Sequence, residues 1–209
     1  MELWQFPVVF IVGVAAGVIN TLAGGGSLIT LPVLIFLGLP ATVANGTNRL
    51  AITVQSVLAV AGFKRKGVSD FKSSLLMSLP ALIGAIIGAQ LAVDVSDILF
   101  KRILAVVMIL VLVLILWNPI RMRQGIAQYD GGMACLSRSR RTAGMLIFFF
   151  IGVYGGFIQA GIGFLIIAVL TTIRGLNLIE TNSHKVFIVG INALFALIVF
   201  IFNSKICWP

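Results

Sequence analysis

Long apolar runs separated by short polar turns make up most of the sequence, and no other feature restricts the possible fold as strongly. The runs cover residues 6–19, 27–39, 50–63, 75–93, 103–117, 143–173 and 186–202. Several approach the length of about 20 residues that a helix needs to cross the roughly 30 Å hydrocarbon core of a membrane. They lack the alternation of apolar and polar residues found in the strands of transmembrane barrels. Only 10% of the residues are charged, against roughly 25% in soluble domains, so we predict an all-α polytopic membrane protein.

The charge of the chain is strongly positive, with 15 Lys and Arg against 6 Asp and Glu. Most basic residues lie between apolar runs, as in the cytoplasmic loops of membrane proteins. The partner that this charge indicates is therefore the lipid bilayer and not nucleic acid. No Lys or Arg precedes the first run, so we expect it to stay as a membrane segment and not to be a cleaved signal peptide. Cys135 and Cys207 have no disulfide or metal-binding spacing, and we expect no metal and no cofactor.

An arginine-rich polar stretch divides the chain into two apolar blocks. We interpret residues 118–142 as a basic cytoplasmic linker between a first membrane repeat, 1–117, and a second membrane repeat, 143–209. One constant shift places Gly24, Gly26, Leu28, Gly38, Leu39 and Asn45 on Gly161, Gly163, Leu165, Gly175, Leu176 and Asn182. So many glycine and asparagine matches at a single shift favour an internal duplication.

The distribution of basic residues also orients the two repeats. With the linker and the Lys64–Lys66 turn in the cytoplasm, the turn around Gly38 faces outward and the matching turn around Gly175 faces inward. The repeats are therefore predicted to be inverted, as in many secondary transporters. The counterpart of run 75–93 would lie beyond Pro209, so the last helix of the second repeat is expected to be missing from this sequence.

Consecutive glycines, Gly24, Gly25 and Gly26, interrupt the first repeat in the stretch "AGGGS", which matches "AGIGF" at residues 160–164. Glycine costs a helix interior about 0.5–1 kcal/mol relative to alanine, so each repeat should contain a short glycine-broken or re-entrant helix. The next segment, up to Gly38, spans only about 17 Å as a helix and is too short to cross. Broken backbone in a membrane is buried in protein or lines a cavity, and N–H groups at a helix N-terminus favour an anion. Close packing of helices through glycine is the alternative.

A polar cluster follows each break, where the next apolar run begins. It is "ANGTNR", residues 44–49, in the first repeat and "TNSHK", residues 181–185, in the second. Its amide and basic side chains are suited to binding an anion. Alternatively, they cap the next helix while Arg49 and Lys185 extend to the membrane surface. His184, the only histidine, is a candidate for proton coupling because its reference pKa of about 6.5 lies near physiological pH.

The carboxylates indicate the charge of the substrate. They are Glu2, Asp70, Asp94, Asp97, Asp130 and Glu180, and none lies inside an apolar run. Cation carriers commonly keep a carboxylate within the membrane, so we predict that the substrate is an anion. The candidate binding residues are Asn20, Gly24, Gly25, Gly26, Asn48, Gln159, Gly161, Gly163, Asn182 and Lys185. No catalytic residue is assigned, because an embedded redox enzyme would need a cluster of Cys, His or carboxylate side chains.

Two stretches resemble the signature halves of one transporter family. They are "GVAAGVINTLAGGGSLITLPVLIFLGLPATVANGTNRLA", residues 13–51, and "GVYGGFIQAGIGFLIIAVLTTIRGLNLIETNSHKVFIVGINALFALIVF", residues 152–200. They closely resemble the sulfite exporter TauE/SafE family, also called the 4-toluene sulfonate uptake permease family. The resemblance implies a multi-pass carrier of the bacterial inner membrane for sulfite, sulfonates or related organosulfur anions. Members usually have one more small-residue-rich helix or hairpin after a tryptophan like Trp208, and often have alanine in place of Thr181.

Together these features predict a secondary transporter of a small, sulfur-containing oxyanion. Alternating access would expose a site between two inverted repeats to each side of the membrane in turn. Whether the chain forms a homo-oligomer is left open. The alternative is a truncated, non-transporting membrane scaffold or partner subunit. A cation carrier lacks its intramembrane carboxylate here, and an embedded enzyme lacks its Cys and His cluster, so we expect that the protein is not an enzyme.

Overall fold

The structure is a computed structural model that describes residues 4–68, 71–117, 138–174 and 176–208. Within these ranges the chain forms α-helices joined by turns, which confirms the predicted all-α architecture. The helices are α1 (Gln5–Leu22), α2 (Ser27–Phe36), α3 (Ala41–Arg65), α4 (Phe71–Asp94), α5 (Asp97–Trp117), α6 (Arg138–Phe157), α7 (Ile162–Arg174) and α8 (Leu178–Phe202). Most of the predicted linker lies outside the described residues, and α6 begins within its last part, at Arg138.

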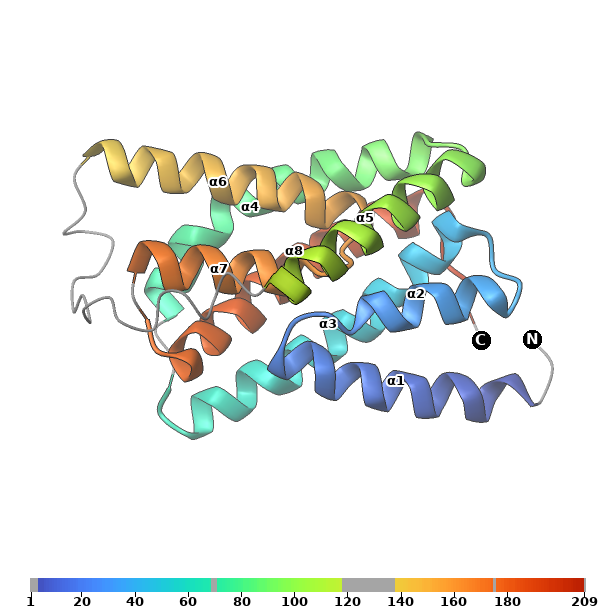
Figure 1. Ribbon diagram of the computed structural model, residues 1–209, viewed down its shortest axis with the longest axis horizontal. Helices are drawn as coiled ribbons and strands as arrows, with labels where there is room; N and C mark the ends of the chain where they lie inside the picture. The colour runs from blue at the N-terminus through green and yellow to red at the C-terminus, as the bar shows by residue number, and fades with distance from the viewer. Residues whose placement is uncertain (1–3, 69–70, 118–137, 175, 209) are drawn as a thin grey trace.

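Two helical hairpins enter the molecule from opposite ends (Figure 1). α2 turns back alongside α1, and α7 turns back alongside α6, whereas the longer α3 and α8 run between the two ends. Each hairpin turns at a glycine with left-handed backbone, Gly24 with φ 88° and Gly161 with φ 73°. Residues with a side chain rarely adopt this conformation. The glycine breaks therefore form the turns of two helical hairpins, each with one short helix, α2 or α7. Whether each short helix is re-entrant or part of a discontinuous helix stays a prediction.

The tips of the two hairpins touch each other. A Cβ atom added to Gly24 would overlap the Cα atom of Gly163, and one added to Gly163 would overlap the Cα atom of Gly24. Backbones approach this closely only where side chains are absent. We call this meeting of Gly24 and Gly163 the glycine contact. It joins the two halves of the chain directly through their backbones.

α4 packs along α6 through glycines on both helices. Cβ atoms added to Gly84 and Gly88 of α4 would overlap backbone oxygens of α6. Those added to Gly152 and Gly156 of α6 would overlap backbone oxygens of α4. The four-residue spacing is typical of closely packed membrane helices. It brings α4, from the first half of the chain, against α6, from the second.

We expect Gly152→Ala to destabilise the protein by roughly 1–3 kcal/mol, because the backbone of α4 leaves no room for the methyl group. Gly13→Ala in α1 is the matched control, since nothing lies within 4 Å of a Cβ atom at that position. It should be neutral or stabilising by up to about 1 kcal/mol, because alanine favours the helix. Thermal unfolding in detergent compares the two variants. Equal melting temperatures would contradict the tight packing of α4 on α6.

Apolar side chains cover the outside of the helices. On α1, Phe10 is 71% exposed and Ile11 is 66% exposed. Among the described residues, three helical segments are long and apolar enough to cross a membrane: Gln5–Leu22, Lys72–Asp94 and Leu178–Phe202. Large exposed apolar surfaces of this kind mark membrane contact. The protein is therefore a multi-pass membrane protein, with lipid around these helices.

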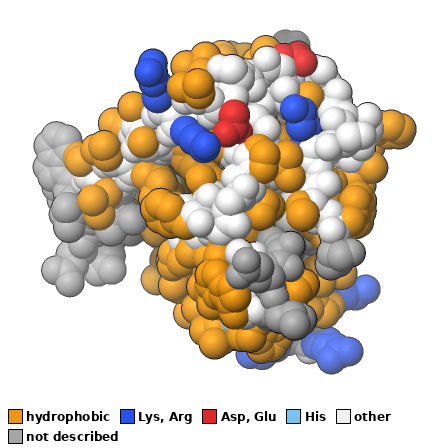
Figure 2. Space-filling model, turned by 90° about the vertical axis from the view of Figure 1, so that its right-hand side faces the viewer, with side chains coloured by type: hydrophobic (Ala, Val, Ile, Leu, Met, Phe, Trp, Pro, Cys, Tyr) orange, Lys and Arg blue, Asp and Glu red, His pale blue; other side chains and the backbone are white. Residues whose placement is uncertain are grey.

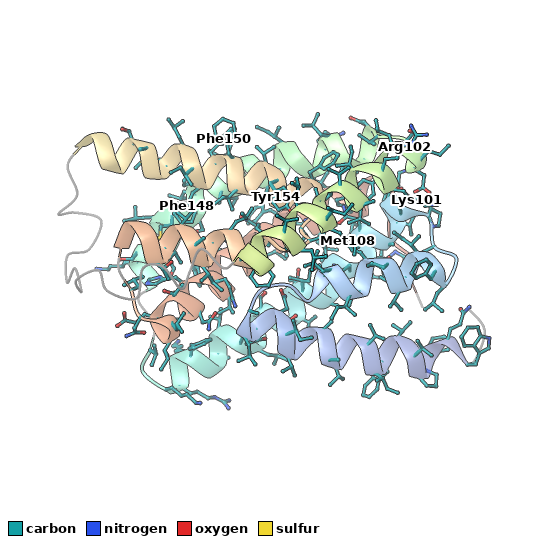
Figure 3. The ribbon with its side chains drawn as sticks, in the orientation of Figure 1. Lys101, Arg102, Met108, Phe148, Phe150 and Tyr154 are labelled. Carbon is teal, nitrogen blue, oxygen red and sulfur yellow. The ribbon has the colours of Figure 1, made fainter. Side chains whose placement is uncertain are left out.

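Charged side chains lie at the ends of the molecule. Figure 2 shows basic and acidic side chains among hydrophobic ones on the end that carries both chain termini. Lys101 and Arg102 lie at this end (Figure 3), and Lys101 Nζ is 3.0 Å from Asp97 Oδ2. The exposed Lys64 and Arg65 end α3 at the opposite end. Charged ends on either side of an apolar belt suit a helix bundle that spans a bilayer.

Candidate functional site

The polar segments that follow the glycine breaks lie inside helices. The sequence predicts them where the next apolar runs begin, yet α3 already starts at Ala41 and α8 at Leu178. Backbone hydrogen bonds extend a helix through polar residues if their side chains find partners. Arg49 is 0% exposed and Lys185 is 1% exposed. The alternative in which these two side chains extend to the membrane surface is therefore wrong.

Lys185 of α8 binds the C-terminal end of α1. Its Nζ donates to the backbone oxygens of Asn20 (3.2 Å) and Thr21 (2.7 Å) and to Asn182 Oδ1 (2.7 Å). The last carbonyls of a helix have no partner within it and carry partial negative charge, so the ammonium group caps α1. An ammonium group has three N–H donors, and these three bonds use all of them. We call these four residues the Lys185 cluster.

Arg49 of α3 caps the C-terminal end of α6 in the same way. Its Nη1 donates to Gln159 Oε1 (2.8 Å), and its Nη2 donates to the backbone oxygen of Gly156. The ring of Phe200 covers the guanidinium group, with Arg49 Cζ 4.9 Å from the ring centroid, within the range of a cation–π contact. We call these four residues the Arg49 cluster. Arg49 is absent from the binding residues predicted from sequence, although a cation in a membrane helix is a signal of function.

The two clusters connect the halves of the chain crosswise. Lys185 of the second half caps α1 of the first, and Arg49 of the first half caps α6 of the second. Both capped ends lead directly into the hairpin tips that form the glycine contact. α1 and α6 run in opposite directions along the long axis (Figure 1), so the two capped C-terminal ends point toward opposite ends of the molecule.

The other predicted amide residues bind neighbouring helices. Asn48 donates to Ser27 Oγ (3.1 Å) and accepts from Thr30 Oγ1 (2.7 Å), which joins α3 to α2. Asn20 Nδ2 donates to Gln55 Oε1 (3.2 Å) in α3. Asn48 therefore holds the first hairpin in place and lies outside both clusters.

The structure thus divides the predicted binding residues among four places, one of which is the link from Asn48 to α2. Asn20, Asn182 and Lys185 lie in the Lys185 cluster, Gln159 lies in the Arg49 cluster, and the predicted glycines form the hairpin tips between them. Among the described residues, the buried side-chain atoms without a hydrogen-bond partner are Asn45 Oδ1, Arg49 Nε, Gln159 Nε2, Asn192 Nδ2 and Asn192 Oδ1. Unpaired buried polar atoms are rare in folded proteins, and all of these lie on α3, α8 or the second hairpin.

Two hollows lie near these groups. A cavity of about 10 Å³ is lined by Asn20, Gly24, Gln55, Ser56, Lys185, Val186 and Val189. It has roughly the space of one water molecule, so the Lys185 cluster is closed to an oxyanion in this conformation. A groove of about 560 Å³ opens at the end that carries the termini, lined by Gln5, Leu37, Gly38, Leu39, Pro40, Val43 and Cys207.

His184 is adjacent to Lys185 in the chain and contacts α4. Its Nδ1 lies 2.7 Å from Ser74 Oγ, and the pair is buried. Among the described residues, no group of three His, Cys, Asp or Glu side chains could hold a metal ion. The buried charged side chains described are Arg49 and Lys185, with no carboxylate among them. The fixed charge of the interior is therefore positive.

The sequence model of the family "Sulfite exporter TauE/SafE" matches residues 9–209. The chain belongs to this TauE/SafE family. A "Probable membrane transporter protein" of Haemophilus influenzae is 26% identical over 205 residues, which are 96% of this chain and 76% of the relative. "Probable membrane transporter protein ORF9" of Sinorhizobium sp is 28% identical over 95% of this chain and 73% of its own length. "Probable membrane transporter protein YfcA" of Escherichia coli K12 is 27% identical over 96% and 72%, respectively. No solved structure matches the chain.

Membership in the TauE/SafE family means that the buried residues Arg49 and Lys185 belong to a membrane transporter. The protein is a membrane transporter of TauE/SafE type, and its relatives are named as transporters and not as enzymes. The apolar belt fits a multi-pass membrane protein of this kind.

Proposed function

We propose that this protein is a secondary carrier for a small oxyanion, with sulfite, a sulfonate or a related organosulfur anion as the substrate. The observation that carries the proposal is the burial of Arg49 and Lys185 without a buried carboxylate among the described residues. Removing an unpaired ion from water costs several kcal/mol, and the backbone carbonyls compensate only part of this cost. An anionic guest between the clusters supplies the missing charge. The sulfur chemistry rests on the family name.

The hairpin tips add backbone donors to this site. α2 begins at Ser27 and α7 at Ile162, each directly after the glycine turn. N–H groups at a helix N-terminus attract anions through their partial positive charge. Both N-termini lie beside the glycine contact, because α2 begins three residues after Gly24 and α7 begins directly before Gly163. The proposed site therefore combines helix ends and basic side chains from both halves.

The arrangement of the hairpins supports alternating access. Each half has the order long helix, short helix, long helix, and the two hairpins enter from opposite ends (Figure 1). Inverted repeats that rock about a central site are common in secondary carriers. The glycine contact lies where such rocking would open or close the path. We place the carrier in the inner membrane of a bacterium because the named relatives come from bacteria.

Flux in liposomes tests the proposal. The purified chain is reconstituted, and uptake of radiolabelled sulfite and methanesulfonate is compared with uptake of sodium. We expect saturable anion flux above that of protein-free liposomes and no sodium flux. Absence of anion flux, together with a fixed protein partner that co-purifies, would contradict the proposal and favour a scaffold subunit.

We further propose that His184 couples a proton to transport through its contact with Ser74. Flux is expected to depend on pH in the unmodified protein, because an imidazole that gains and loses a proton changes its bond with Ser74. His184→Gln keeps a polar group beside Ser74 and should give flux with less dependence on pH. Initial rates in liposomes at fixed ionic strength measure this. An unchanged pH profile in the variant would remove His184 from the mechanism.

A further inference from the structure

We infer that the Arg49–Gln159 pair is the oxyanion receptor of this conformation, whereas Lys185 is held in a locked state. This inference rests on the proposed function and assigns its first binding step to one of the two cations. It follows from a comparison of the N–H donors that already have acceptors in Lys185 with those that lack acceptors in the Arg49–Gln159 pair.

The donors of Lys185 are fully used. Its three hydrogen bonds, to Asn20 O, Thr21 O and Asn182 Oδ1, match the three N–H groups of an ammonium. An oxyanion can bind this group only if one of these acceptors is released. The Lys185 cluster is therefore closed in this conformation.

The Arg49–Gln159 pair, in contrast, has N–H donors that lack an acceptor among the described residues. Arg49 Nε and Gln159 Nε2 have no partner among the described residues, although Arg49 is 0% and Gln159 is 1% exposed. The two side chains are held together by the bond from Arg49 Nη1 to Gln159 Oε1, 2.8 Å long. Buried donors without an acceptor are unfavourable. A guest that accepts from both would relieve this.

The geometry of the pair selects the class of guest. Phe200 covers the guanidinium group, Nη1 and Nη2 each make one bond, and Nε is the guanidinium nitrogen without a partner among the described residues. Gln159 lies in a left-handed backbone conformation, with φ 66°, which is uncommon for a residue with a side chain. Two donors from different residues suit an anion with two or more oxygens, because separate oxygens can accept from each. A single-atom anion such as chloride suits this arrangement less well.

The two clusters then act in sequence. An oxyanion binds first at the Arg49–Gln159 pair. To move past the glycine contact it must take the place of a carbonyl or amide on Lys185. That exchange releases the cap on the C-terminus of α1 and frees the first hairpin to move. Release of the Lys185 hydrogen bonds is thus the step of the transport cycle that allows the first hairpin to move.

Binding measurements on the purified full chain test the inference. Titration calorimetry in detergent at fixed ionic strength, with sulfite under nitrogen, methanesulfonate or chloride as the probe, gives the affinities. Gln159→Glu keeps the side-chain volume and the bond to Arg49 but replaces the free amide N–H by a carboxylate oxygen. We expect it to weaken sulfite binding at least roughly tenfold, as expected for loss of a bond to a charged guest. Lys185→Gln should weaken sulfite binding less than Gln159→Glu does, because the three N–H donors of Lys185 are already engaged within the protein.

A second substitution at Gln159 distinguishes a loss of sulfite binding from a loss of folding. Gln159→Met removes the free donor without adding charge and should also weaken sulfite binding, while thermal unfolding shows that the variant is folded. Unchanged sulfite affinity in both Gln159 variants would overturn the inference, as would loss of binding confined to Lys185→Gln. If sulfite flux in liposomes persists in the unmodified protein in either case, the proposed function stands and the receptor assignment fails. An unmodified protein without anion binding or flux would contradict both.

Discussion

Gly163→Ala is expected to abolish anion transport, although it adds a single methyl group. The new Cβ atom would overlap the backbone of Gly24 at the glycine contact. Backbone atoms cannot move aside as a flexible side chain can, so the hairpin tips must separate. Forced insertion of a methylene into packed structure costs typically 1–3 kcal/mol. We expect anion flux in liposomes to fall to the level of protein-free vesicles, and the melting temperature to fall as well.

Gly17→Ala is the matched control for this experiment. Gly17 lies in α1 of the first hairpin, and nothing lies within 4 Å of a Cβ atom there. Its flux should equal that of the unmodified protein, and its stability should be equal or higher by up to about 1 kcal/mol. Normal flux and stability in Gly163→Ala would show that the tips are not in contact in the working protein.

Lys185→Met is expected to reduce sulfite flux by roughly ten- to a hundredfold, the loss that removal of a charge-assisted hydrogen bond predicts. The substitution leaves the carbonyls of Asn20 and Thr21 without their donor, but it also removes the cost of burying a cation. These effects oppose each other, so the stability should change less than the flux. Liposome uptake and thermal unfolding measure the two quantities separately.

Lys101→Met provides the control for the loss of a positive charge. Its ammonium group is half exposed and pairs with Asp97 on the surface, where ion pairs contribute little. We expect normal sulfite flux in this variant. Equal flux in Lys185→Met and in the unmodified protein would mean that the buried cation has no part in transport.

The sequence predicts the architecture because apolar length and glycine breaks are local signals. The hydrophobic runs indicate membrane helices, and "AGGGS" with its counterpart "AGIGF" indicates the two hairpin turns. The turn at Gly24 needs left-handed backbone, and this requirement is visible as glycine in the sequence. Local patterns therefore suffice to place the hairpins along the chain.

The position of Arg49 could not be read from local patterns. Its carbonyl partner, Gly156, is 107 residues away in the sequence. The Lys185 partners are 165 and 164 residues away. A polar turn before an apolar run gives no sign of such distant acceptors, so a helix start beyond residue 49 and a surface position for Arg49 were reasonable alternatives.

Asn48 shows that the same sequence position is compatible with two roles, and its role as a substrate ligand stays a prediction. Its position in "ANGTNR" predicts a substrate ligand, but its amide binds Ser27 and Thr30 of α2. Amide side chains serve equally well as ligands and as links between helices. Only the arrangement of the hairpins decides between these roles.

Sulfite uptake by the double variant Arg49→Gln/Lys185→Gln tests the central claim most directly, that the two buried cations bind the transported anion. Uptake into liposomes is measured beside that of the unmodified protein, after thermal unfolding has shown that both are folded. We predict saturable uptake by the unmodified protein and uptake equal to that of protein-free liposomes by the double variant. Equal uptake by the two proteins would contradict the claim.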